Sequence, residues 1–295
     1  MRDPIVRRPK QLARGVVERV LQLSDERRRI DEKTSPATKI ALRSLLHTYQ
    51  RLVAAGEPLP SIRDSGFRVF SQFDEDGVIL YLLGAGGMGP RRYVDLGAGD
   101  GVYASNCANL ALNLGFDGLL VEADAAKAAH ARRFYERHPD TRERPPAVVQ
   151  AFVTRENVDE LIRGAGFEGE IDLLSIDVDG NDYWLWEALT SVSPRLVVVE
   201  AQTELGLEDY VMPYEAGFDW RSAPPGATIG ASPAAFLRLA GELGYRLVGS
   251  NLYGFNLCFA RNDVGVGTLP AIGIDELFRH GSYSRAVHRP DAADA

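Results

Sequence analysis

The sequence contains only two cysteines, Cys107 and Cys258, which excludes the disulfide framework that supports many small secreted proteins. It has no apolar run near the roughly 20 residues that a membrane-spanning helix needs. The first ten residues are charged and lack the apolar core of a signal peptide. We therefore expect a cytoplasmic protein without a membrane span.

An excess of positive charge is also lacking, because the net charge is −8. The first 60 residues hold 13 Lys+Arg and 7 Asp+Glu, which leaves 20 Lys+Arg against 34 Asp+Glu in the rest of the chain. An acidic body argues against nucleic acid as the main partner. For the basic N-terminal segment, a solvated helix face docked on the acidic body is favoured over a contact with nucleic acid or lipid.

The first 60 residues show helical periodicity. Residues 11–30 predict one helix, with Val16, Val17, Val20 and Leu21 on one face. A second helix is predicted after the capping pair Ser35-Pro36, and its apolar residues are Ala41, Leu45, Tyr49, Leu52 and Val53. Both faces need a partner, so the pair forms either a lid over the main domain or a homodimer contact. We expect a helical segment over 1–60, a main domain over 61–265 and a C-terminal tail over 266–295.

Strands and helices alternate through the main domain. Apolar runs predict five strands: Tyr93–Leu96, Gly118–Glu122, Ala147–Val153, Ile171–Asp177 and Arg195–Glu200. Helical patterns lie at Val78–Leu83, Val102–Leu114, Asp124–His138, Asn157–Gly164, Tyr183–Leu189 and Ser232–Leu243. Tyr245–Gly249 and Phe255–Ala260 indicate a hairpin, after a long irregular stretch over 202–230. The pattern predicts an α/β fold with a mostly parallel sheet, helices on both faces and an antiparallel C-terminal hairpin.

Three glycines at alternate positions, Gly97, Gly99 and Gly101, follow the first predicted strand. Such a loop lets the backbone approach a nucleotide closely. The dinucleotide fingerprint needs a further glycine at its sixth position, where this chain has Val102. Asp95, near the strand end, suits a ligand with an ammonium group and repels a pyrophosphate. The loop therefore favours S-adenosylmethionine (SAM) over a nicotinamide dinucleotide.

Residues at the ends of the next two strands extend this nucleoside site. Glu122 stands 21 residues after Gly101, where an acid accepts ribose hydroxyls in either cofactor class, although a surface acid is the alternative. Phe152 and Val153 either flank the adenine or belong to the core. Asp124 is expected to cap the following helix.

A cluster of acids is predicted at the ends of the fourth and fifth strands. Asp177 and Asp179 end one strand, and Glu200 ends the other, so all three reach the edge of the sheet where ligands bind in such folds. Carboxylates are ligands of hard cations such as Mg²⁺. The cluster either holds a metal that binds an acceptor diol, or supplies a general base, or only hydrogen-bonds the substrate. Asn181 and Asp182 are expected merely to cap the next helix.

Together these motifs resemble the FkbM-like branch of class I SAM-dependent methyltransferases over about residues 68–262. The matching pieces are Ser71–Gly77, Val94–Gly101, Asn106–Asn109, Gly118–Asp124, Ile176–Tyr183, Val198–Glu200, Gly230–Ser232 and Gly244–Val248. The glycine-loop motif is common to all such enzymes, whereas the pieces that begin at Ser71 and at Ile176 are more particular to this branch.

The resemblance implies a seven-stranded Rossmann-like sheet with the last strand antiparallel, and methyl transfer to a hydroxyl of a sugar or secondary metabolite. It places Gln72 near the methionine end of SAM. Similar sugar methyltransferases hold a divalent metal with carboxylates of strands four and five, which maps onto Asp177, Asp179 and Glu200, although Ala201 stands where a second acid would follow. The cofactor-binding candidates are Gln72, Asp95, Gly97, Ala98, Gly99, Asn106, Glu122, Ala123, Phe152, Val153 and Asp177.

The sequence thus predicts a SAM-dependent O-methyltransferase for a small hydroxylated acceptor, with Asp177, Asp179 and Glu200 as catalytic and metal-binding candidates and Mg²⁺ as the candidate metal. A nicotinamide-dependent oxidoreductase is one alternative. The other is a SAM-binding protein without catalysis that acts as an assembly partner.

Overall fold

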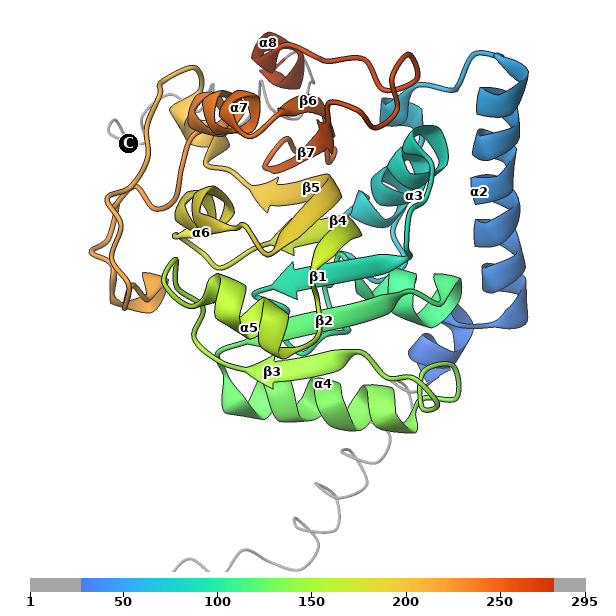
Figure 1. Cartoon of the computed structure of the whole chain (residues 1–295), viewed down its shortest axis with the longest axis horizontal. Helices are drawn as coiled ribbons and strands as arrows, with labels where there is room; N and C mark the ends of the chain where they lie inside the picture. Colours follow the sequence, from blue (N-terminus) through green and yellow to red (C-terminus); the bar gives the residue numbers. More distant parts are fainter. Residues whose placement is uncertain (1–27, 279–295) are drawn as a thin grey trace, which may run out of the picture.

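The computed structural model describes residues 28–278 (Figure 1). Residues 28–33 are helical, but the apolar face predicted for the first helix, from Val16 to Leu21, lies outside the described residues. Within 28–278, no helix is both long enough and apolar enough to span a membrane.

A seven-stranded sheet with the order β3-β2-β1-β4-β5-β7-β6 forms the centre of the fold. Strands β1 to β5 are parallel, and β7 runs antiparallel to both β5 and β6. The predicted fold class is confirmed, including the antiparallel C-terminal pair. The strands are β1 (Arg92–Leu96), β2 (Asp117–Glu122), β3 (Ala147–Gln150), β4 (Gly169–Ile176), β5 (Val192–Glu200), β6 (Tyr245–Ser250) and β7 (Asn256–Arg261).

Two apolar clusters, one on each face of the sheet, hold the helices. One face is covered by α2 (Pro36–Ala55), α3 (Glu75–Gly86), α4 (Ala125–Arg137) and the π-helical turn η2 (Leu110–Leu114). The other is covered by α5 (Val158–Gly164), α6 (Asp182–Ala188), α7 (Pro233–Glu242) and α8 (Ile274–Phe278). Short 3-10 turns are η1 (Ile62–Asp64), η3 (Thr203–Leu205) and η4 (Trp220–Ser222). In Figure 1 the segment after β5 lies on the left and α2 on the right.

The buried face of α2 agrees with the predicted one only in part. Tyr49 is buried and the predicted leucines and valine are half-buried, but Ala41 is exposed, and Leu42 and Leu46 are buried in addition. The Tyr49 ring packs edge-on against Tyr81 of α3, with 5.3 Å between ring centroids. A helix turns its largest apolar side chains toward its neighbour, so Leu42 and Leu46 lie in the contact and the small Ala41 lies outside it. The apolar face of α2 is thereby covered by α3 of the same chain.

The helix predicted from residue 102 begins later. Helical turns run over 108–114, and residues 102–107 are irregular. The Asp100 carboxylate accepts from the N–H groups of Val102, at 3.0 Å, and Tyr103, at 2.7 Å. A side chain that takes up these donors stabilises a turn in competition with the helix. The prediction of a helix over 102–107 was wrong for this reason.

Candidate active site

The glycine loop after β1 is fastened to two neighbouring strands. The N–H groups of Gly97 and Ala98 both donate to the carbonyl of Val121 in β2, at 3.0 and 3.1 Å. Gly97 has a φ of 87°, and a Cβ at this position would lie 1.7 Å from the carbonyl oxygen of Asp177. Only glycine allows this approach. The loop therefore touches the turn that carries the predicted catalytic acids.

Glu122, at the end of β2, is oriented by backbone donors. It is only 9% exposed, which excludes the surface-acid alternative. One carboxylate oxygen accepts from the Gly99 N–H at 2.8 Å, and the other accepts from the Asp124 N–H at 2.7 Å. Each oxygen keeps a lone pair for a further donor, which suits a ribose diol. Asp124 itself caps α4 through the N–H groups of Ala126 and Lys127, as predicted.

Asp95 lies beneath the glycine loop and is buried. Burial raises the pKa of Asp95 to about 7, although hydrogen bonds from Cys107, Ser175 and Ser105 act in the opposite direction. Asn106 is buried in the same place, and its amide donates to the Ser175 hydroxyl at 3.4 Å. These groups form a buried polar cluster beside the glycine loop. A contact between Asp95 and a ligand ammonium group stays a prediction.

The residues predicted to flank an adenine lie after β3 rather than in it. The strand ends at Gln150, because Asn157 folds back and its amide donates to the Phe152 carbonyl at 3.0 Å. Phe152 is 46% exposed, which excludes a core role, whereas Val153 packs partly buried against one apolar cluster. Ala123 lies at the same edge, where its carbonyl accepts from the Gln150 amide at 3.0 Å.

The three predicted catalytic acids are brought together at the ends of β4 and β5. One carboxylate oxygen each of Asp177, Asp179 and Glu200 lies within 4.8 Å of the other two. Burial, then the negative charges of neighbouring acids, raises the pKa of Asp177 well above its usual range and that of Glu200 to about 7. Within residues 28–278, these three carboxylates have no hydrogen-bond or ion-pair partner. Their hard oxygen donors fit a cation such as Mg²⁺.

The turn that carries Asp179 has a left-handed residue and a side-chain brace. Asp179 adopts a φ of 55°, a region that residues other than glycine rarely occupy, although aspartate tolerates it better than most. The Asp182 carboxylate accepts from the N–H groups of Val178 and Gly180, both at 2.9 Å. Asp182 therefore holds the turn before α6, in contrast to the predicted cap of that helix.

The irregular segment over 202–230 is tied to α6 next to this turn. The Asn181 amide donates to the Glu215 carbonyl at 2.9 Å, and the Trp184 indole donates to the Met212 carbonyl at 2.8 Å. Asn181 precedes α6 but makes no side-chain cap bond, so its predicted capping role is replaced by this contact.

A cleft of about 500 Å³ lies between this segment and the acid cluster. Both polar and apolar side chains line this cleft. The wall includes Asp179, Glu200, Gln202, Glu204, Trp220 and Thr228. Sequence reasoning missed Gln202, Glu204 and Thr228, because an irregular segment has no periodicity that marks inward-facing residues. The cleft offers hydrogen-bonding groups and one indole ring to a small polar molecule.

No known family model matches the sequence, and no curated protein matches it. Solved structures with a similar chain fold include magnesium protoporphyrin IX methyltransferase from Synechocystis PCC 6803 with bound SAM. That chain is 15% identical, the match covers 63% of this chain and 77% of that one, and the TM-score is 0.39. An O-methyltransferase from Bacillus cereus in complex with S-adenosylhomocysteine (SAH) is 18% identical, over 55% of this chain and 67% of that one, with a TM-score of 0.34.

Mitomycin 7-O-methyltransferase is 14% identical, and the match covers 77% of this chain and 58% of that one, with a TM-score of 0.34. At such scores these similarities carry no argument about this chain's chemistry. The fold assignment rests on the strand order and strand directions of the sheet itself. Membership of the FkbM-like branch stays a prediction.

Proposed function

We propose that the protein is a SAM-dependent methyltransferase that methylates a hydroxyl of a small acceptor, such as a sugar or a secondary metabolite. One juxtaposition supports this function most directly. Gly97 lies against the carbonyl of Asp177, so the nucleoside site beside Glu122 adjoins the acid cluster and its cleft. A cofactor held on one side of this contact would meet an acceptor held on the other.

On the cofactor side, the ordered loop and the Glu122 carboxylate would bind the nucleoside. Ala123, Phe152 and Val153 would border the adenine, while Asp95 would lie toward the methionine part. Gln72 and Asn106 complete this half. When bound, SAM supplies an electrophilic methyl group.

On the acceptor side, a hydroxyl oxygen would attack the methyl carbon, so that an O–C bond forms while the S–C bond breaks. The hydroxyl proton then passes to a carboxylate. Glu200 suits this step, because a base with a pKa of about 7 is matched to neutral pH. Positioning and exclusion of water supply most of the remaining rate enhancement. Asp177, Asp179 and Glu200 would alternatively hold Mg²⁺, which would lower the pKa of the bound hydroxyl.

Calorimetric titration with SAM, SAH and NAD⁺ tests the cofactor assignment. We expect SAM and SAH to bind and NAD⁺ not to bind, because Val102 replaces the glycine of the dinucleotide fingerprint. Binding of NAD⁺ without SAM would refute the proposal.

A methyl-transfer screen against hydroxylated sugars and metabolites, with and without Mg²⁺, tests the reaction. Asp179→Asn removes one charge at the cleft and leaves the loop intact, so it should lower the turnover of any acceptor that the wild type methylates. SAM binding without turnover of any acceptor would instead support a non-catalytic SAM-binding protein.

A further inference from the structure

Three consecutive acids at the start of α3 each hold a different segment of the chain. Asp76 is 2% exposed, and its Oδ2 accepts from the N–H groups of Val69, Phe70 and Ser71 at 2.7, 2.6 and 2.8 Å. The Ser71 hydroxyl donates to the same oxygen at 2.8 Å. Ser71 also pairs with Ala104 in an isolated parallel β-bridge. Asp76 thus pins residues 69–71 beside the end of the glycine loop.

Glu75 pins the other side of the same turn. It is also 2% exposed, and its Oε2 accepts from the Phe73 N–H at 2.8 Å. Its Oε1 accepts from the side-chain amides of Asn251, at 2.8 Å, and Asn256, at 2.9 Å. Asn256 is the register partner of Glu200 in the β5–β7 pair. Glu75 therefore joins residue 73 to the strand that borders the acid cluster.

Further contacts fix this turn to the β6–β7 hairpin. The Asp74 carboxylate accepts from the Leu252 N–H at 2.9 Å. The Phe73 ring meets those of Tyr253 and Phe255 edge-on, with centroid distances of 4.5 and 5.6 Å. The turn is thus held on one side by the glycine loop and on the other by the hairpin.

Gln72 stands between the two pinned residues. Its neighbours Ser71 and Phe73 are fixed through their N–H groups, yet its own side chain is exposed and has no hydrogen-bond partner among the described residues. A backbone fixed from both sides lowers the entropy cost of binding a ligand through the Gln72 amide.

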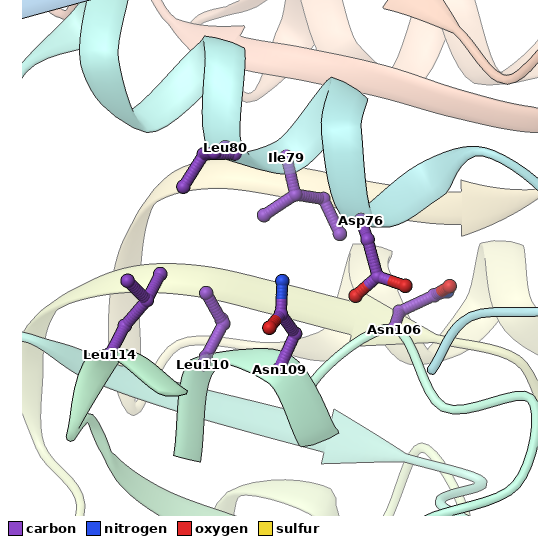
Figure 2. Close-up of a pocket in the computed structure, with 7 residues that line it drawn as sticks. All are labelled: Asp76, Ile79, Leu80, Asn106, Asn109, Leu110 and Leu114. Atoms are coloured by element: carbon purple, nitrogen blue, oxygen red, sulfur yellow. The ribbon is translucent and has the colours of Figure 1, made fainter. Parts of the chain in front are cut away.

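Asp76 also reaches toward the cofactor half. Figure 2 shows it pointing from α3 toward Asn106 and Asn109. Its Oδ1 is buried without a hydrogen-bond partner in the described part of the chain. All four contacts of this carboxylate therefore go to residues 69–71, and they order the turn before Gln72.

We propose that Glu75 and Asp76 are positioning residues that hold Gln72 at the bound cofactor, a role that presupposes the proposed function. Their carboxylates touch neither cofactor nor acceptor. They fix the position and orientation of the turn from which the Gln72 amide binds the cofactor. Loss of either carboxylate therefore weakens cofactor binding through Gln72 and leaves the methyl-transfer step itself intact.

A double-mutant cycle tests this coupling. SAH affinity is measured by calorimetry for the wild type, Gln72→Ala, Glu75→Gln and the double variant. We expect each single variant to bind SAH about fivefold to tenfold more weakly, the size of one lost hydrogen bond. The double variant should bind only as weakly as Gln72→Ala, because Glu75 acts through Gln72. Asp64→Asn, an exposed acid of η1, is the matched control and should leave the affinity unchanged.

The outcomes separate the two proposals. Absence of SAH binding by the wild type overturns the proposed function and this role with it. Wild-type binding with unchanged affinity in Glu75→Gln, or with additive losses in the double variant, overturns the positioning role alone. If Glu75→Gln does not fold, Asn251→Ala, which removes one donor to Glu75, replaces it in the same cycle. With an acceptor in hand, Glu75→Gln should raise the KM for SAM and keep kcat, whereas a purely structural role would lower only Tm.

Discussion

The two halves of the candidate site hold their carboxylates in opposite ways. On the cofactor side, the oxygens of Glu122 are satisfied by two backbone N–H groups. On the acceptor side, Asp177, Asp179 and Glu200 face one another with no such donors within residues 28–278. The first arrangement orients the carboxylate before a ligand arrives and leaves a lone pair on each oxygen, whereas the second leaves charge for a proton, a cation or a hydroxyl to balance. Under the proposed function, the fold thus prepares the nucleoside contact in advance, and the chemistry depends on what enters the acceptor half.

The largest effect is expected where the two halves touch. Gly97→Ala would place a Cβ 1.7 Å from the Asp177 carbonyl, so we expect the free energy of unfolding to fall by about 3 kcal/mol or more and SAH binding to be lost. Gly99→Ala is the control, because its φ is also positive but no atom lies within 4 Å of the added Cβ. Urea unfolding should show a loss of only about 1–2 kcal/mol for this variant. Equal losses would contradict the close contact.

The next largest effect should fall on turnover and leave cofactor binding unchanged. Asp179→Asn removes a charge at the cleft, and we expect kcat to fall about 100-fold because the acceptor loses its carboxylate partner. The Kd for SAM should stay within about threefold, since the cofactor half is unchanged. Steady-state kinetics and calorimetry measure the two quantities. Unchanged turnover both in this variant and in EDTA would show that the metal role is wrong.

A smaller effect, on cofactor affinity and not on turnover, is expected from Glu122→Ala. Loss of two charge-assisted hydrogen bonds to the ribose, and of the anchor for the Gly99 N–H, should weaken SAH binding about thirtyfold, or ~2 kcal/mol. The kcat at saturating SAM should remain near the wild-type value. Glu122→Gln, which keeps one acceptor, should lose less affinity. A variant that lost kcat but kept its affinity would show that the two halves are not separable.

The smallest effect concerns pH. Burial, with Asp182 and Asp179 nearby, raises the pKa of Glu200 from 4.5 to about 7. The folded state then binds this proton more tightly than the unfolded chain, so its contribution is present below a pH of about 4.5 and is lost as the pH rises toward 7. In EDTA, Tm should fall by about 2–4 °C more over this interval in the wild type than in Glu200→Gln. Differential scanning fluorimetry measures both proteins.

The fall of Tm with rising pH is the decisive observation, and the change in Tm on adding Mg²⁺ is a second test. A cation bound by the three carboxylates replaces the proton, so it should raise Tm more near neutral pH than in acid. The variant also separates Glu200 from Asp95, whose pKa is raised into the same range. A Tm that rises with pH equally in both proteins would contradict the unbalanced charge.

Much of the sheet was predictable because buried parallel strands appear in a sequence as continuous apolar runs. The first was expected over Tyr93–Leu96 and is found over Arg92–Leu96. The meeting of Asp177 with Glu200 followed from the same pattern, since β4 and β5 are neighbours with ends at the same edge. These features depend on local periodicity and on the general rules of strand order.

Contacts between distant segments were not predictable in this way. The hydrogen bond from Asn251 to Glu75 joins residues 176 positions apart, and no periodicity connects them. Asp100 delays the start of the expected helix through a local side-chain contact that competes with helical propensity. The cleft wall around Gln202 and Thr228 is likewise set by how an irregular segment folds back, which residue spacing does not encode.

The place of β7 between β5 and β6 determines when the protein can become complete during its synthesis. β7, the last strand of the described residues 28–278, is not an edge strand, so the β5 edge from Leu196 to Glu200 has no partner until residues 256–261 have left the ribosome. An apolar strand with free N–H and C=O groups is a template for pairing with other chains. The nascent polypeptide therefore carries an unpaired apolar edge from the synthesis of β5 until that of β7, and premature termination before Asn256 would release this edge uncovered.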